Sequence, residues 1–228
     1  MAEVVPFSLY HGTSTIFLAS ILETGLGGRN VVAEWRAVEC LTRLIAVADN
    51  VFGNTPDWIG ERYGLDLMAR QAVTGAHMNF RHGGAYLSPT EVSAVRYAVT
   101  NTVGSEILSE CVKLLRAPAL EGEALSEVGR EFPSILGLAA IEVEAQPLLL
   151  RLDAVPLAAV QTEQGVNPSE QISMLLSFSP DLLSTVGQQF NFELVEPFQI
   201  DPSQVWVISS TGYLGNPQSY ELEPWVAT

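Results

Sequence analysis

The chain has 228 residues, of which 47% are hydrophobic, so it is long enough to bury one sizeable core and a single domain is expected. Its 26 acidic and 11 basic residues give a formal net charge of −15, and no basic run is present to neutralise phosphates, which disfavours DNA or RNA as a partner. The first residues lack the features of a secretory signal peptide, and no run of about 18 apolar residues could span a membrane. We therefore expect a soluble, cytoplasmic protein that does not associate with membranes.

Histidine and cysteine side chains form no metal-binding pattern. Cys40 and Cys111 are too few for a disulfide framework and lack the spacing of metal ligands, so we expect buried, reduced thiols. His77 and His82 are five positions apart in a glycine-flanked stretch with no further His or Cys nearby. A flexible loop is expected there, and no metal site.

The N-terminal part of the chain predicts a strand followed by a short helix. Residues 4–10 form an apolar stretch that is typical of a strand. Ser14 or Thr15 is expected to cap a helix through Glu23, where apolar residues repeat at i,i+4, and Gly25 supplies the stop.

Two further helices precede the next predicted strand. Asn30 is expected to cap a helix that continues to about Asn50, and residues 56–72 have a weaker helical pattern that ends near Gly75. Residues 85–87 then form a short apolar strand.

The clearest helix signal is the run Ser88-Pro89-Thr90-Glu91. Ser as N-cap, Pro at the first helical position and Glu at the third make a capping box. A helix from residue 89 to about residue 100 is therefore predicted.

The remaining elements alternate between helices and strands. They are a helix at 103–116, a loop or lid with a short helical piece at 117–134, a strand pair at 139–153 with a bend or edge at Pro147, a helix at 180–189, and strands at 190–200 and 204–209. Strands gather at the beginning, middle and end of the chain with helices between them. The predicted fold class is therefore α+β and not a βαβ repeat.

Two short segments in the first half of the chain contain residue types that suit a binding site. The first is His11-Gly12-Thr13, which follows the first predicted strand. The second is GGAYLS at residues 83–88, in which Tyr86 precedes Tyr97 of the capped helix by eleven positions. Each segment alone also fits a structural role, as a capping or core histidine and as a glycine turn with core aromatics.

A third segment lies near the C-terminal end of the sequence. It reads EPFQIDPSQVWVI over residues 196–208, and Glu196 opens a predicted hairpin of two terminal strands. Alone, this glutamate fits a solvated carboxylate at a strand end.

Taken together, the three segments resemble the diphtheria-toxin-like class of ADP-ribosyltransferases, especially the poly(ADP-ribose) polymerase catalytic domain. HGTSTIFLASILETGL matches the family's His-Gly-Ser/Thr segment without a gap, GGAYLSPTEVSAVRYA matches its Gly-X-Tyr segment, and EPFQIDPSQVWVIS matches the segment that opens with the catalytic glutamate. The resemblance implies an ADP-ribosyltransferase-like split antiparallel β-sheet core with peripheral helices. It implies a single catalytic domain over residues 1–228, with a helical insertion at about 27–82.

The resemblance also implies a His-Tyr-Glu triad of His11, Tyr86 and Glu196. Breaking the nicotinamide–ribose bond of NAD⁺ develops positive charge on the sugar, which a site must stabilise. Glu196 is implied as the carboxylate that binds the 2′-hydroxyl of the nicotinamide ribose, stabilises this cation and helps to activate the acceptor.

The other implied roles concern binding of NAD⁺ as co-substrate, with no metal. The main-chain N–H and C=O of Gly12 would hold the nicotinamide carboxamide, where a side chain would block close approach. His11, assisted by Thr13, would bind the adenosine ribose. Tyr86 and Tyr97 would stack on the nicotinamide ring.

The sequence departs from the family at one position of the second segment. Where the family commonly has a serine three residues before the second tyrosine, this chain has Ala94, and the adjacent Ser93 points elsewhere on a helix. Weaker nicotinamide binding is the expected consequence. Arg29 or Arg81 is a candidate for the pyrophosphate, with a surface role as the alternative.

The function implied is that of an NAD⁺-dependent ADP-ribosyltransferase, a glycosyltransferase that moves ADP-ribose to a protein or small-molecule acceptor. Transfer of a single unit ranks first, because the chain carries none of the regulatory or DNA-binding domains of the nuclear polymerases. Compact enzymes of this kind resemble bacterial toxins, effectors or phage-defence enzymes. The alternatives are an NAD⁺ glycohydrolase with water as acceptor, an inactive module that binds NAD⁺ or a partner, and RNA 2′-phosphotransfer, which the acidic charge disfavours.

The partners expected are NAD⁺ and an acceptor whose identity depends on loops at 27–82 and 117–140. A cell that makes an NAD⁺-consuming enzyme also has reason to make an inhibitory, antitoxin-like partner.

Overall fold

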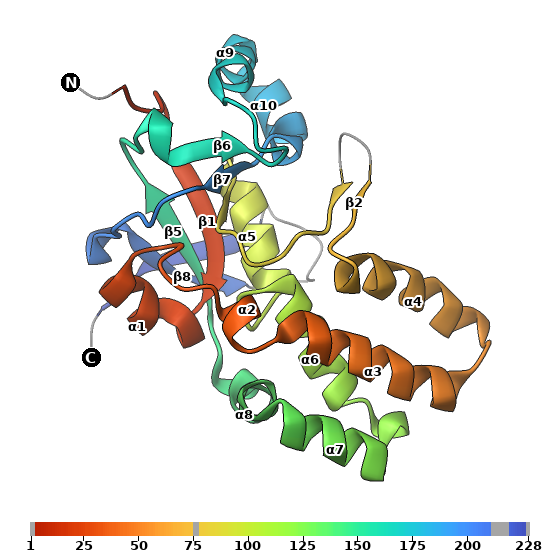
Figure 1. Cartoon of the computed structure of the whole chain (residues 1–228). Helices are drawn as coiled ribbons and strands as arrows, with labels where there is room; N and C mark the ends of the chain where they lie inside the picture. Colours follow the sequence, from red (N-terminus) through yellow and green to blue (C-terminus); the bar gives the residue numbers. More distant parts are fainter. Residues whose placement is uncertain (1–2, 75–77, 211–218, 227–228) are drawn as a thin grey trace. The chain divides into compact units, whose positions relative to one another are not determined.

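The computed structural model describes residues 3–74, 78–210 and 219–226. Within these ranges the protein mixes helices with antiparallel sheets, so the α+β class predicted from the sequence is confirmed (Figure 1). No helix of the described ranges combines the length and the apolar character that crossing a membrane requires.

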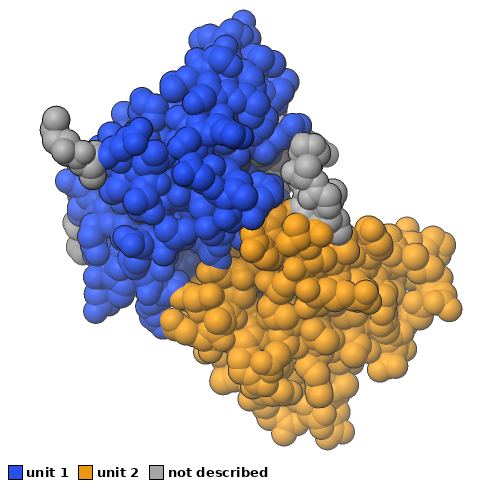
Figure 2. All heavy atoms as spheres, turned by 45° about the horizontal axis from the view of Figure 1, so that its top comes forward, with its two compact units in different colours: residues 1–29, 84–104, 145–228 blue, residues 30–83, 105–144 orange. Residues whose placement is uncertain are grey.

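The chain divides into two compact units, each built from separate segments (Figure 2). Unit 1 comprises Met1–Arg29, Gly84–Gly104 and Ala145–Thr228, and unit 2 comprises Asn30–Gly83 and Ser105–Glu144. The predicted insertion at about 27–82 lies largely in unit 2, which also takes in residues 105–144.

Unit 1 contains both larger sheets. Its strands are β1 (Leu9–Ser14), β4 (Tyr86–Leu87), β5 (Pro147–Leu152), β6 (Val160–Thr162), β7 (Phe192–Leu194), β8 (Val205–Ser210) and β9 (Tyr220–Pro224). Its helices are α1 (Thr15–Thr24), α5 (Glu91–Thr100), α9 (Ser169–Ser177) and α10 (Pro180–Val186), with 3-10 turns at Leu157–Ala159, Gly187–Gln189 and Pro202–Gln204.

Two antiparallel sheets organise these strands. One has the order β1-β5-β8-β9 and the other has the order β4-β7-β6. An isolated antiparallel bridge joins them, since Tyr10 N donates to Ser88 O at 2.9 Å and Ser88 N donates to Tyr10 O at 2.8 Å. The first sheet is covered by α5, whose buried Ala94, Val95 and Ala98 pack against strands β5 and β8.

Unit 2 is mainly helical. Its helices are α2 (Val31–Glu34), α3 (Ala37–Phe52), α4 (Pro56–Ala69), α6 (Glu106–Leu115), α7 (Glu123–Glu131) and α8 (Pro133–Ile141), with 3-10 turns at Pro118–Leu120 and Glu142–Glu144. A short hairpin pairs β2 (Val73–Thr74) with β3 (Met78–Asn79).

The core of unit 2 lies where α3 packs on its neighbouring helices. Leu41, Leu44 and Ile107 are fully buried there. Cys40 and Cys111 are buried and free, as predicted. The Cys111 Sγ donates to Ala37 O at 3.6 Å, and its hydrogen bond with Cys40, together with burial, raises the pKa of the Cys111 thiol.

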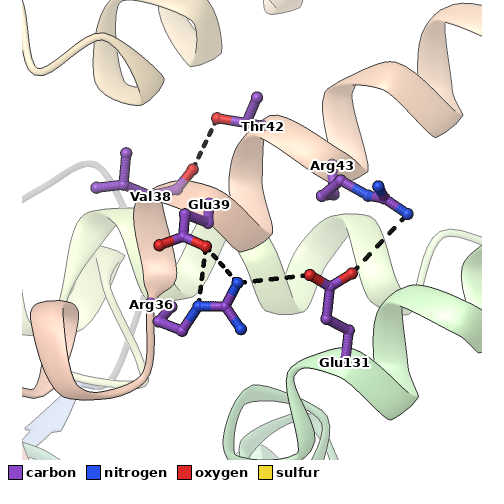
Figure 3. Close-up of polar contacts among 6 residues, drawn as sticks. All are labelled: Arg36, Val38, Glu39, Thr42, Arg43 and Glu131. Atoms are coloured by element: carbon purple, nitrogen blue, oxygen red, sulfur yellow. Dashed lines mark hydrogen bonds and ion pairs between the residues drawn. The ribbon is translucent and has the colours of Figure 1, made fainter.

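Ion pairs join the beginning of α3 to the end of α7 (Figure 3). The Arg36 guanidinium contacts the Glu39 carboxylate, with Nε to Oε2 at 2.8 Å, and reaches Glu131 Oε1 at 3.5 Å. Arg43 approaches the other Glu131 oxygen at 3.8 Å, and the Arg36 guanidinium also lies 5.0 Å from the centre of the Phe132 ring. These groups are exposed to solvent, so water screens the ion pairs and they contribute little to stability.

Several helices begin or end as the local signals predicted. Ser14 caps α1, where its side chain accepts from Ile16 N, and Gly25 ends the helix at a φ of 84°. The helices predicted at 56–72, 103–116 and 180–189 correspond to α4, α6 and α10. Gly75, the expected end of one of them, lies outside the described residues.

The strand expected at residues 4–10 lies later in the chain than predicted. Val4 makes only an isolated bridge, whereas β1 runs from Leu9 to Ser14 and therefore contains His11. Pairing with β5 sets these limits, because the register runs from Leu9 opposite Leu152 to Ser14 opposite Pro147.

Asn30 caps a helix as predicted, but the long helix expected after it is interrupted, and the helix start predicted at Ser88 is wrong. Asn30 Oδ1 accepts from Ala33 N at 3.0 Å, but the helix it caps ends at Glu34, and Arg36 takes a left-handed φ of 55° before α3 begins. The capping box at Ser88 also does not form. Ser88 pairs with Tyr10 in extended conformation and its Oγ accepts from Thr90 N at 3.2 Å, so α5 begins two residues later, at Glu91.

The middle of the chain is more helical than predicted. Residues 117–134 were expected to form a loop or lid with a short helical piece, but α7 takes up nine of them after Gly122, and Pro133 is the first residue of α8. Glycine and proline therefore mark helix ends here. The strand pair predicted at 139–153 is a single strand, β5, and it begins at Pro147, where a missing N–H is tolerated.

The predicted hairpin of strands 190–200 and 204–209 is also wrong. The first region contains β7, which pairs with β4 and β6, and the second contains β8, which pairs with β5 and β9.

Candidate functional site

The six residues predicted for the site all belong to unit 1. Three of them, His11, Gly12 and Thr13, lie on β1, while Tyr86 lies on β4 and Tyr97 on α5. Glu196 follows β7.

His11 connects the first predicted segment to the second. Its Nδ1 lies 2.8 Å from the main-chain oxygen of Tyr86. Because a carbonyl only accepts, Nδ1 must carry the proton, which leaves the Nε2 lone pair able to accept a hydrogen bond. Burial lowers the pKa of His11, against the opposing effect of this hydrogen bond, so the neutral ring is favoured.

Gly12 has its main-chain polar groups at the edge of β1. In an antiparallel ladder, successive residues direct their N–H and C=O to opposite sides. Tyr10 exchanges both hydrogen bonds with Ser88, so Gly12, two residues further on, directs its own groups to that same edge and away from β5. One donor and one acceptor are thereby presented side by side.

Gly12 also lies close to the main chain of α5. A Cβ added to Gly12 would lie 2.1 Å from Ala94 O and 2.9 Å from Ala98 N, both of which are main-chain atoms. Any larger residue would therefore separate the helix from the strand. This contact brings the turn of α5 that contains Tyr97 next to Gly12.

Thr13 and Tyr97 differ in exposure. Thr13 is 2% exposed, and a Cβ added to Gly104 would lie 3.0 Å from its Oγ1, so its side chain is packed inside the protein. Tyr97 is 38% exposed and presents an aromatic surface on α5. Of the two, Tyr97 is the better placed to contact a ligand.

The Glu196 segment is held to the end of α1. Leu26 N donates to Phe198 O at 2.8 Å, and Phe198 N donates to Leu26 O at 2.9 Å. On the other side of Glu196, Val195 N donates to Ala159 O at 3.0 Å. The main chain is thus fixed on both sides of Glu196, which is itself exposed.

Ala94 stands where the resembled family commonly has a serine. It is 3% exposed because it packs against β1. The neighbouring Ser93 hydroxyl is 2.6 Å from Thr90 Oγ1.

The basic candidates for the pyrophosphate fall in different units. Arg29 belongs to unit 1, whereas Arg81 belongs to unit 2, where Asn79 Oδ1 accepts from its main-chain N at 3.0 Å.

The histidine-containing stretch is only partly described. His77 lies outside the described residues, while burial lowers the pKa of His82 to about 4. In residues 3–74, 78–210 and 219–226, no group of three or more His, Cys, Asp or Glu side chains is arranged to hold a metal ion.

Sequence reasoning missed two residues beside Tyr86. Glu193 on β7 is directly opposite Tyr86, and Gln161 on β6 is opposite Glu193. The signal was present in the sequence, because Glu193 lies between the apolar Phe192 and Leu194 in a period-two strand pattern. The pattern alone does not show which strands pair with β7.

Comparison with known proteins returned nothing: no family model, no curated protein and no solved structure matches this chain. The chemistry of the site must therefore be argued from its own groups. They are a neutral imidazole with a free acceptor, a main-chain donor and acceptor at a strand edge, two tyrosines and a carboxylate on a fixed segment.

Proposed function

We propose that this protein is an NAD⁺-dependent ADP-ribosyltransferase that transfers a single ADP-ribose to a protein or small-molecule acceptor. The observation that carries the proposal is that three segments far apart in the sequence meet in unit 1. His11 bonds to Tyr86, Gly12 contacts the α5 turn that contains Tyr97, and the Glu196 segment pairs with Leu26, which follows α1. The pair of antiparallel sheets joined between Tyr10 and Ser88 supports a split-sheet fold of the ADP-ribosyltransferase kind.

The edge of β1 suits the carboxamide of nicotinamide. A carboxamide has an N–H₂ donor and a C=O acceptor in one plane, and the main chain of Gly12 offers the complementary acceptor and donor. Tyr97, on the helix next to this edge, supplies an aromatic face for the ring. Tyr86 is the second aromatic group in the proposal.

His11 suits a ribose hydroxyl. Its Nδ1–H is used by Tyr86 O, so Nε2 is left to accept from an O–H. This assignment requires the neutral ring, which the lowered pKa favours. The adenosine ribose is the hydroxyl-bearing group that we assign to this position.

Glu196 is the residue to which we assign the chemical step. The bond from the ribose C1′ to the nicotinamide nitrogen breaks, nicotinamide leaves with the electron pair, and a nucleophile of the acceptor forms the new bond to C1′. A carboxylate stabilises the positive charge that develops on the sugar and can take the proton that the nucleophile releases. Its position on a segment fixed on both sides limits its movement during the reaction.

The test is nicotinamide release from NAD⁺ by the purified protein and by its Glu196→Gln variant. We expect release by the wild type and a loss of at least about a hundredfold in the variant, the size typical of removing one transition-state group. Glu223→Gln is the matched control, because it removes an exposed carboxylate of β9 in the same unit and should leave release unchanged.

Adenine-labelled NAD⁺ added with a cell lysate identifies the acceptor class. Label attached to protein or to a small molecule is expected. Label recovered only as free ADP-ribose would instead identify a glycohydrolase, and absence of release in both conditions would contradict the proposal.

A further inference from the structure

A row of polar side chains crosses the second sheet of unit 1 on one face. The register places Tyr86 of β4 opposite Glu193 of β7, and Glu193 opposite Gln161 of β6. The three side chains are partly exposed. The opposite face of the sheet consists of the buried Leu87, Phe192, Leu194, Val160 and Thr162.

The carboxylate of Glu193 is held in the middle of this row. On one side, Gln161 Nε2 donates to Glu193 Oε2 at 2.8 Å. On the other side, a Cβ added to Gly84 would lie 2.6 Å from Glu193 Oε1, so the carboxylate fills the space beside Gly84. Leu194 N also donates to Ala85 O at 2.9 Å, which holds the residue before Tyr86 to the same strand.

In the register of the sheet, Glu193 lies between Gln161 and Tyr86. The Gln161 amide holds the Glu193 carboxylate, which occupies the space beside Gly84, two residues before Tyr86. Because the contacts lie on the polar face, changes to them leave the apolar face of the sheet intact.

We propose that Glu193 and Gln161 form a positioning pair that sets the place of Tyr86 in the NAD⁺ site. The inference rests on the proposed function, in which Tyr86 contacts nicotinamide. Glu193 is not a catalytic residue in this proposal, since it acts through Tyr86 and the neighbouring Gly84. Its effect is therefore on binding of NAD⁺ and much less on the chemical step.

The test first changes Gln161 alone and then exchanges the amide and the carboxylate between positions 161 and 193. Gln161→Glu alone places two carboxylates side by side, and their repulsion should displace the Tyr86 side chain. We expect the KM for NAD⁺ to rise about tenfold, equivalent to about 1.4 kcal/mol, while kcat changes by less than about twofold. The double variant Gln161→Glu with Glu193→Gln restores one amide-to-carboxylate hydrogen bond, and we expect it to return KM to within about twofold of the wild type.

Two controls accompany these variants. Glu170→Gln changes an exposed carboxylate on α9 and should alter neither the KM for NAD⁺ nor kcat. Glu196→Gln should lower kcat.

A second measurement does not depend on turnover. The protein is labelled with 3-fluorotyrosine, and the ¹⁹F resonance of Tyr86 is assigned with a Tyr86→Phe variant. Gln161→Glu is expected to shift this resonance, and the double variant is expected to return it to its original position. The thermal unfolding of each variant shows whether the fold is kept.

The outcomes separate this inference from the proposed function. A wild type that releases no nicotinamide would reject the proposed function, and the ¹⁹F spectra would still decide whether the pair positions Tyr86. Failure of the double variant to restore both KM and the Tyr86 resonance would overturn the inference. So would a Glu193→Gln variant that loses kcat as completely as Glu196→Gln, because Glu193 would then take part in the chemistry itself.

Discussion

At Gly12 the lack of a side chain serves packing as well as the proposed binding role. The family resemblance gave a ligand-based reason for this glycine, whereas the distances give a reason within the protein. The main chain of α5 occupies the position that a Cβ would take. The two reasons are compatible, because close approach of α5 is what brings Tyr97 to the edge of β1.

Gly12→Ala is therefore expected to destabilise the protein even without ligand. The added Cβ would meet Ala94 O at 2.1 Å, and a main-chain atom cannot move aside as a flexible side chain can. Overpacking of this kind costs about 1–3 kcal/mol or more. Chemical denaturation followed by circular dichroism measures the change.

Gly60→Ala is the matched control. Gly60 lies within α4, nothing approaches the position of its Cβ within 4 Å, and the same substitution should stabilise that helix by about 0.5–1 kcal/mol. Equal stability of the Gly12→Ala variant and the wild type would show that α5 lies further from β1 than described.

The buried ring of His82 is expected to make the stability of the protein depend on pH. Its Nε2 is buried and has no hydrogen-bond partner among the described residues, and burial lowers its pKa from 6.5 to about 4. Between pH 4 and pH 6.5 the His82 ring binds a proton in the unfolded chain but not in the folded protein. The free energy of unfolding therefore keeps its full value above pH 6.5 and decreases as the pH falls towards 4. The loss is on the order of 3 kcal/mol, at about 1.4 kcal/mol for each pKa unit.

Urea unfolding at pH 7 and pH 4 of the wild type and of His82→Gln measures this contribution. Other groups titrate in the same range, so the difference between the two proteins is the relevant quantity. The wild type should lose more stability than the variant, and equal losses would contradict the assignment to His82.

At the scale of elements, local signals predicted helix ends better than strand partners. The Ser14 cap and the Gly25 stop act within one turn of α1, so the sequence alone identifies them. The same kind of signal failed at Ser88, because pairing with Tyr10 keeps this residue extended and moves the start of α5. A contact with a distant segment outweighed a local preference.

The candidate site remains a prediction, and it depends on residue types in order along the chain. His11, Tyr86 and Glu196 could be named because their three segments, taken together, resemble those of a known family. Glu193 and Gln161 could not, because their relation to Tyr86 exists only in the register of β4, β7 and β6. Sheet register depends on which strands meet, and β7 meets strands far away in the sequence.

At the scale of the whole molecule, each unit has its own core. Leu41 of α3 is fully buried in unit 2, while Leu149 of β5 is 1% exposed in unit 1, where it packs against α5. Compact units with separate cores commonly open as separate cooperative units in hydrogen exchange. The chain passes between the units more than once, so this independence has to be measured in the intact protein.

Leu41→Ala and Leu149→Ala provide that measurement. Each substitution removes buried side-chain volume and should cost about 2–5 kcal/mol in its own core. We expect Leu41→Ala to speed amide exchange within residues 30–74 and 105–144, and Leu149→Ala to speed exchange within residues 84–104 and 145–210. Exchange that rises equally in both units for either variant would mean that they unfold as one, and a change in the helices of unit 2 would then alter the stability of the candidate site in unit 1.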